Sequence, residues 1–163
     1  TLWLNNNTLG CNEYDYECDP FGNKQSCCIE HCNASDMCRG EIPESITTLN
    51  ELQSLKLSHN YLIDTIPVNI GNMGNLKYLH LDNNFLFGEI PSSIGYLTKL
   101  RRLYLLNNDL IDEVPNSICN LYHNLDGFKL YLHNNNLCPG ELGYPTCIPE
   151  VDLGLQNRSD CSH

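Results

Sequence analysis

Three residues have the side-chain types that serine hydrolases use: Ser58, His80 and Asp82. They fall on neighbouring predicted strands and face the same side, where a nucleophile, a base and an orienting acid would have to meet. The repeat register described below places His80 beside Lys56. It leaves Ser58 beside Asp82, so the histidine does not bridge the hydroxyl and the carboxylate. Since no glycine-rich turn for an oxyanion hole accompanies them, the sequence predicts that this protein is not an enzyme.

Two segments have residue types that bind metal ions. Residues 27–32 include three cysteines and a histidine, but they lack the distant second pair of a structural zinc site. Acidic residues alternate over 13–19, yet the glycine and the bidentate glutamate of a calcium loop are missing. We therefore interpret the first segment as disulfide-bonded and the second as a solvated acidic loop. The sequence predicts neither a metal site nor a cofactor.

Charge and cysteine content indicate the partner class and the compartment. The 163-residue chain carries 9 Lys and Arg against 20 Asp and Glu, a formal net charge of −11. This balance argues against nucleic acid as a partner, because phosphate binding needs a basic face. Ten cysteines are typical of disulfides in an extracellular protein, either secreted or at the cell surface. No apolar run approaches the roughly 18–20 residues of a membrane span.

The positions of Ser58, His80 and Asp82 in space depend on a sequence repeat. Segments that begin at Leu52, Leu76 and Leu100 superimpose at a 24-residue period, and each reads L-x-x-L-x-L-x-x-N-x-L before I-P or V-P. In the L-x-L unit both leucines point to one side of a short strand, so stacked repeats share one core and form a parallel sheet. A fourth, slipped copy and an opening half copy extend the pattern. We predict five parallel strands near residues 2–4, 55–57, 79–81, 103–105 and 130–132.

Two further positions in the repeat predict how each coil turns. One asparagine per repeat can bond the backbone where the chain leaves the sheet, and stacking such residues makes a ladder. A proline after Ile or Val suits extended backbone that enters a turn. The apolar spacing after it predicts one short 3₁₀ or α turn on the convex side. The expected ladder residues are Asn7, Asn60, Asn84, Asn108 and Asn135.

The repeated motif resembles the plant-type extracellular leucine-rich repeat, L-x-x-L-x-L-x-x-N-x-L-x-G-x-I-P, over residues 1–9 and 38–137. Pectinase inhibitors and receptor-kinase ectodomains have such repeats. The resemblance implies a leucine-rich repeat solenoid with a short parallel β-sheet of about five strands and an irregular or 3₁₀ convex side. It also implies a C-terminal cap and a protein, peptide or polysaccharide ligand, and the cysteine positions described next add a disulfide-rich insertion to the expected fold.

A cysteine-rich insertion, residues 10–38, interrupts the first repeat, whose I-P arrives only at residues 42–43. We therefore expect the solenoid over 1–137, interrupted by this insertion, and a C-terminal disulfide cap and tail over 138–163. The six cysteines of the insertion allow several pairings, and the sequence does not choose among them. They are Cys11, Cys18, Cys27, Cys28, Cys32 and Cys38.

The other four cysteines are expected to pair near the C-terminus. The sequence of residues 135–147 resembles the cap of the family, which implies a bond between Cys138 and Cys147. Cys119 and Cys161 would then pair with each other. The alternative pairs Cys119 with Cys138 and Cys147 with Cys161. Three N-x-S/T sequons predict N-glycans at Asn6, Asn33 and Asn157.

The outward side chains of the strands form the candidate binding surface. Aromatic and arginine side chains on an exposed sheet are typical of recognition surfaces, although β-propensity alone can also place them there. The ligand-contact candidates are Trp3, Lys56, Tyr78, His80, Asp82, Arg102, Tyr104 and Tyr131.

Two interpretations of function remain open. In the first, the protein is a module that binds a protein or polysaccharide ligand through this surface. In the second, identical subunits assemble head-to-tail into an extracellular filament or coat, because no cap precedes Thr1 and an open sheet edge attracts a partner. A missing N-terminal part or the insertion could cover that edge instead.

Overall fold

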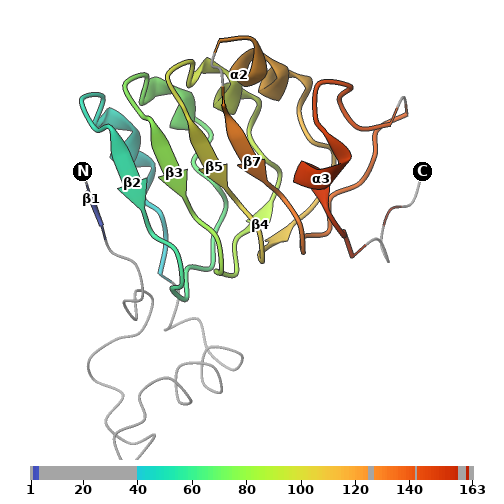
Figure 1. The fold of residues 1–163 in the computed structure, drawn as a ribbon. Coiled ribbons are helices and arrows are strands. Elements are labelled where there is room, and N and C mark those ends of the chain that lie inside the picture. The colour runs from blue at the N-terminus through green and yellow to red at the C-terminus, as the bar shows by residue number, and fades with distance from the viewer. Residues whose placement is uncertain (1, 4–39, 125–126, 142, 158–160, 162–163) are drawn as a thin grey trace, which may run out of the picture.

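The computed structural model describes residues 2–3, 40–124, 127–141, 143–157 and 161. Five parallel strands form one sheet, side by side in chain order (Figure 1). The fold is the predicted leucine-rich repeat solenoid. The strands are β1 Leu2–Trp3, β2 Ser54–Lys56, β3 Tyr78–His80, β5 Arg102–Tyr104 and β7 Lys129–Tyr131.

Four of the strands begin one residue earlier than predicted. The reason is that pairing starts at the residue before the first leucine of L-x-L. The backbone still pairs at the second leucine, since Leu57 N–H donates to the carbonyl of His80 at 2.8 Å. The assigned bounds therefore differ, while the pairing of leucines between strands agrees with the repeat register.

The predicted leucine core is confirmed within the described residues. Leu55, Leu79 and Leu103 stand in register on neighbouring strands and are fully buried. The same core continues to Ile148 and Leu153 near the C-terminus. Each fully buried leucine side chain stabilises the fold by about 1.5–3 kcal/mol. The boundary that we expect between solenoid and cap at residue 137 stays a prediction.

Short turns occupy the convex side, as expected. Among the described residues, three of the four 3₁₀ turns begin directly after a proline in extended conformation, which is consistent with the fixed φ of proline. The sequence did not predict the short helix α2, Cys119–Asn124, or the two-stranded sheet of β4, Phe87–Gly88, and β6, Asp109–Leu110. The 3₁₀ turns are η2 Glu44–Thr48, η3 Ile70–Asn72, η4 Ser92–Tyr96 and η5 Asn116–Ile118.

The asparagine ladder forms at the described positions. The Asn84 side-chain oxygen accepts a hydrogen bond from Leu62 N–H at 3.3 Å. Its amide donates to the carbonyls of Leu57 and Leu81, both at 3.0 Å. Because Asn84, Asn108 and Asn135 each bond to the backbone of a neighbouring coil as well as their own, the ladder holds these repeats together. Asn7 lies outside the described residues.

A second, outer ladder runs beside the first and was not predicted. Asn107 donates to the side-chain oxygen of Asn83 at 2.8 Å, and Asn134 donates to that of Asn107 at 2.6 Å. All three residues have a positive φ of 53–57°. Asparagine tolerates this left-handed conformation better than most side chains do, which explains its use at this turn.

The C-terminal segment lies along the outer edge of β7. Helix α3, Glu150–Leu153, sits beside this strand in Figure 1. Leu132 N–H donates to the carbonyl of Asp152 at 3.0 Å, and Asn134 N–H donates to that of Leu155 at 2.7 Å. The chain thus satisfies backbone groups that the last strand would otherwise leave exposed.

The two disulfides near the C-terminus differ from both pairings expected from the sequence, so both expectations were wrong. Cys119 is bonded to Cys147, and Cys138 is bonded to Cys161. Cys138 continues the lateral row of the coils, because its N–H donates to the carbonyl of Asp112 at 2.9 Å. Cys147 packs instead against the core near α2, which brings it to Cys119 and away from Cys138. The six cysteines of the insertion lie outside the described residues.

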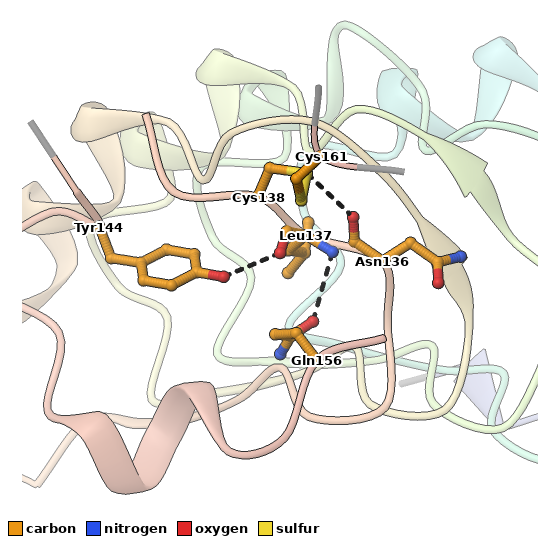
Figure 2. The surroundings of a disulfide bond; sticks show 6 residues. All are labelled: Asn136, Leu137, Cys138, Tyr144, Gln156 and Cys161. Atoms are coloured by element: carbon orange, nitrogen blue, oxygen red, sulfur yellow. Dashed lines mark hydrogen bonds between the residues drawn. A yellow bond between two sulfur atoms is a disulfide. The ribbon is translucent and has the colours of Figure 1, made fainter. Parts of the chain in front are cut away.

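Figure 2 shows how the second disulfide is anchored. The hydroxyl of Tyr144 donates to the carbonyl of Leu137 at 2.8 Å. The N–H of Leu137 donates to the side-chain oxygen of Gln156 at 3.4 Å. Tyr144, before α3, and Gln156, after it, therefore both form hydrogen bonds with the backbone of Leu137, the residue next to Cys138. Within the described ranges, no helix has the length and apolar character needed to cross a membrane.

Candidate ligand-binding face

The outward side chains of β2, β3, β5 and β7 lie in two rows that we call the sheet face. The register aligns Lys56, His80, Tyr104 and Tyr131 in one row. A second row aligns Tyr78 with Arg102 and Lys129. The parallel register explains this arrangement, because the middle residue of every L-x-L unit points away from the core.

The first row is a run of rings, of which one pair is stacked and two pairs meet edge to face. The ring centroids of His80 and Tyr104 are 4.2 Å apart, and their planes differ by 16°. Tyr131 meets Tyr104 edge to face at 4.8 Å, and His133 meets Tyr131 at 6.3 Å. We call His80, Tyr104, Tyr131 and His133 the aromatic row. His133 is not among the candidates expected from the sequence, although the strand alternation places it on the same side.

Two cations flank one ring of the second row. The Lys56 Nζ and the Arg102 guanidinium carbon each lie 5.8 Å from the ring centroid of Tyr78. Both separations are within the range of cation–π attraction. Tyr78 also meets His80 edge to face at 6.4 Å. We call Lys56, Tyr78, His80 and Arg102 the Tyr78 cluster.

His80 is the buried centre of this cluster, with an exposed fraction of 9%. Its Nε2 is buried, and it has no hydrogen-bond partner among the residues that the structure describes. Burial lowers the pKa of the His80 imidazole, and the positive charge of Lys56 lowers it further. Asp82 opposes these effects, and Arg102 adds to them. The ring is therefore neutral at neutral pH.

Asp82 belongs to a fixed polar network. The Ser58 hydroxyl donates to one carboxylate oxygen at 2.6 Å, and the Asn83 amide donates to the other at 2.8 Å. The Nε2 of His59 lies 4.0 Å from the same carboxylate. Because the Ser58 hydroxyl bonds directly to Asp82, the geometry is not that of a serine triad.

The structure thus places seven of the eight ligand-contact candidates on or beside one face. The backbone of Trp3 pairs in register with Lys56, which puts the eighth candidate on the neighbouring strand. The side chain of Trp3 lies outside the part of the chain that the structure describes. A separate hollow of about 350 Å³ is found near the C-terminal end, lined by amide side chains that include Asn134, Asn136 and Asn157.

Comparison with known families and structures agrees with this geometry. The Leucine Rich Repeat family matches residues 51–73, 75–97 and 99–121. A chain of the BIR3–SERK2 complex from Arabidopsis thaliana is 36% identical with a TM-score of 0.58, over 68% of this chain and 56% of that chain. The ectodomain of the Arabidopsis thaliana receptor kinase SOBIR1 is 36% identical with a TM-score of 0.56, over 65% and 55%.

A third solved structure holds a peptide. The Arabidopsis receptor kinase HAESA, in complex with the peptide hormone IDA and the co-receptor SERK1, is 40% identical with a TM-score of 0.55. The match covers 61% of this chain and 16% of that chain. The chain thus spans little more than half of the first two structures and much less of the third. No curated protein matched the sequence.

The chain is therefore a leucine-rich repeat solenoid, similar to the plant extracellular proteins of this type. A leucine-rich repeat solenoid of this kind presents an extended surface suited to protein–protein interaction. The first class of function expected from the sequence agrees with this similarity.

Proposed function

We propose that this protein is an extracellular recognition module that binds a protein or peptide partner through the sheet face. The observation that carries the proposal is the aromatic row, which runs across β3, β5 and β7 with cations along its side. Tyrosine and arginine side chains are enriched where protein interfaces gain most of their binding energy. The resemblance to HAESA, which is solved with a peptide hormone and a co-receptor, supports a partner of the same kind.

Self-assembly into a filament is the second candidate from the sequence. Head-to-tail docking would need an open strand edge at the C-terminal end. There the chain's own segment already accepts hydrogen bonds from Leu132 and Asn134. We therefore prefer recognition of a different molecule to assembly of identical subunits, and a polysaccharide ligand is the remaining alternative.

A selection from a displayed peptide library tests the proposal. We expect peptides that bind the wild-type protein to lose binding to the Tyr104→Ala and Tyr131→Ala variants. Tyr96→Ala is the matched control, because Tyr96 is 70% exposed on η4 of the convex side. Recovery of no peptide, or of peptides that respond equally to all three variants, would exclude the sheet face as a peptide-binding surface.

We also propose that the protein is secreted or held at the cell surface and carries N-glycans. Asn157 is the one sequon asparagine within the described residues, and it is exposed. Mass spectrometry of material from the native source, before and after enzymatic glycan removal, is expected to show a glycan on Asn157. Asn6 and Asn33 stay predictions, since both lie outside the described residues.

A further inference from the structure

A second surface of the protein lies on the lateral side of the coils, where β4 and β6 pair. Phe85 N–H donates to the carbonyl of Leu62 at 2.9 Å, which joins the first two coils there. Asp109 N–H donates to the carbonyl of Leu86 at 2.8 Å and joins the next coil in the same way. Leu62, Leu86 and Leu110 are buried. Because side chains alternate along extended backbone, the residues before and after each of these leucines point outward.

Five of these six outward positions are apolar. The rings of Tyr61 and Phe85 stack with their centroids 6.2 Å apart. Phe85, Phe87 and Ile111 have exposed fractions of 42%, 46% and 42%. Exposed apolar side chains that gather on neighbouring coils indicate an interaction site, whereas single scattered ones do not. We call Tyr61, Ile63, Phe85, Phe87 and Ile111 the lateral patch.

The surroundings of the lateral patch are acidic. Segments 60–66, 84–90 and 108–114 carry the patch, and they contain five Asp and Glu residues and no Lys or Arg. One of these acids, Asp109, stands opposite Phe87 in the strand register. Such a surface attracts a partner that combines apolar side chains with Lys or Arg. The five acids are Asp64, Glu89, Asp109, Asp112 and Glu113.

Charge also decides which occupants of the lateral patch are unfavourable. If two copies of the chain met patch to patch, each would bring the same five acids against those of the other. The cysteine-rich insertion, residues 10–38, contains six Asp and Glu against one Lys, so its charge has the wrong sign as well. A basic partner reduces the repulsion among the five acids, whereas either of these occupants would add to it.

We propose that the lateral patch is a second protein-interaction surface, which binds a cationic and apolar segment of a partner protein. The apolar side chains of that segment cover Phe85, Phe87 and Ile111, and its Lys or Arg side chains meet Glu89 and Asp109. This inference goes beyond the proposed function, because it uses a different side of the solenoid and does not depend on the sheet face.

The test uses three acetylated and amidated hexapeptides with the whole 163-residue chain. The probe is Lys-Phe-Lys-Leu-Lys-Phe. One control peptide has Glu in place of each Lys, and the other has Ser in place of Phe and Leu. We expect the probe to shift the amide resonances of Phe85, Phe87 and Ile111 in a saturable way, and both control peptides to leave them unchanged. Absence of these shifts, which is also the result if residues 10–38 cover the patch, would overturn the proposal.

Matched substitutions test the apolar contact. Phe85→Ser/Phe87→Ser is expected to bind the probe at least about tenfold more weakly, because the peptide no longer buries the two rings. Leu49→Ser/Tyr96→Ser removes side chains that are 47% and 70% exposed at η2 and η4 of the convex side. This control is expected to bind within about twofold of wild type. Equal losses in both variants would contradict the inference, and the amide spectrum of the remaining residues shows that each variant is folded.

A second pair of variants tests the charge. Glu89→Gln/Asp109→Asn is expected to bind the probe about fivefold more weakly at low salt, and this difference should shrink as salt is added. Glu51→Gln/Glu150→Gln removes the same charge from exposed side chains outside the three segments of the patch. We expect this control to stay within about twofold of wild type. An equal effect of both pairs would show general attraction to an acidic protein and refute the site.

The two proposals fail in different ways. A probe that shifts the amides of Tyr104 and Tyr131 instead of those of the lateral patch would refute the lateral site and leave recognition by the sheet face standing. Failure of the library selection would refute the proposed function, whereas the probe titration would still decide on the lateral patch. Sedimentation of a wild-type dimer that Phe85→Ser/Phe87→Ser dissociates would assign the patch to a second copy of the chain and overturn the proposal.

Discussion

Gln156 occupies, beyond the last strand, the hydrogen-bonding place that Asn135 has within the ladder. The Asn135 side chain bonds to the backbone of Leu105, Leu110 and Leu132. The Gln156 side chain bonds to the backbone of Leu132, Leu137 and Leu153 in the same donor and acceptor pattern. The tail after α3 is thus a reduced repeat that closes the sheet, with glutamine in place of asparagine.

Replacing Gln156 by alanine is therefore expected to open the C-terminal edge. The substitution leaves Leu137 N–H and the carbonyls of Leu132 and Leu153 without this partner. We expect a loss of about 1–3 kcal/mol in unfolding free energy. Amide hydrogen exchange should accelerate at Leu132 and Asn134. Leu155→Ala is the control, because that side chain is 84% exposed and its carbonyl is unchanged; exchange that rises equally in both variants would argue against a ladder role.

The two asparagine ladders are expected to differ in how much they contribute to the free energy of unfolding. Asn108 is 7% exposed, and it accepts from Leu86 N–H while donating to the carbonyls of Leu81 and Leu105. Asn108→Ala leaves several buried backbone groups unpaired and should cost about 3 kcal/mol or more in denaturant unfolding.

Asn107→Gly is the matched substitution in the outer ladder. Glycine keeps the φ of 53° that alanine would strain, so the change removes the side-chain bonds alone. We expect a cost of about 1 kcal/mol or less. An Asn108→Ala loss no larger than this would mean that the inner ladder is not the main polar link between coils.

The features of the fold that recur in every repeat could be predicted from the sequence. Leu55, Leu79 and Leu103 recur at one spacing, and a solenoid converts that spacing directly into neighbours in space. The tail was missed because Gln156 is not an asparagine, although it follows Leu153 at the same three-residue spacing by which Asn135 follows Leu132. The cysteine pairing was wrong because it depends on the path of residues 138–147 across the end of the solenoid, which no repeat specifies.

The candidate site was predictable only in part for the same reason. Strand alternation placed the side chains of the sheet face together. Their mutual geometry, such as the stacking of His80 on Tyr104, depends on rotamers that the pattern does not determine. The burial of His80 also depends on its neighbours in the row, so its unpartnered nitrogen could not be read from the sequence.

The bond between Cys138 and Cys161 is expected to hold the tail against the lateral side of the coils. Its loop of 23 residues predicts a contribution of about 3 kcal/mol through restriction of the unfolded chain. The Cys138→Ser/Cys161→Ser variant should show this loss in denaturant unfolding at equal slope. Peptide mapping without reduction should recover the Cys138–Cys161 and Cys119–Cys147 pairs, and recovery of a Cys138–Cys147 peptide would contradict the structure.

Replacing His80 by phenylalanine tests how its buried ring affects stability. Phenylalanine keeps the stack on Tyr104 and removes the unpartnered nitrogen. At about pH 8 we expect the variant to be more stable by about 1 kcal/mol, because it no longer buries an unpaired polar atom.

The difference in unfolding free energy between His80→Phe and wild type should increase as the pH falls. In the unfolded chain His80 has its ordinary pKa of 6.5, whereas burial and the charges of Lys56 and Arg102 lower its pKa in the folded protein. Above pH 6.5 both states are neutral, and His80 adds no pH dependence. Below it the unfolded chain binds more protons, so wild-type stability falls until the pH drops below the folded pKa. Thermal unfolding between about pH 8 and pH 5 should show this decline in wild type and Tyr104→Phe but not in His80→Phe. Parallel curves for all three would mean that the ring titrates normally in the folded state.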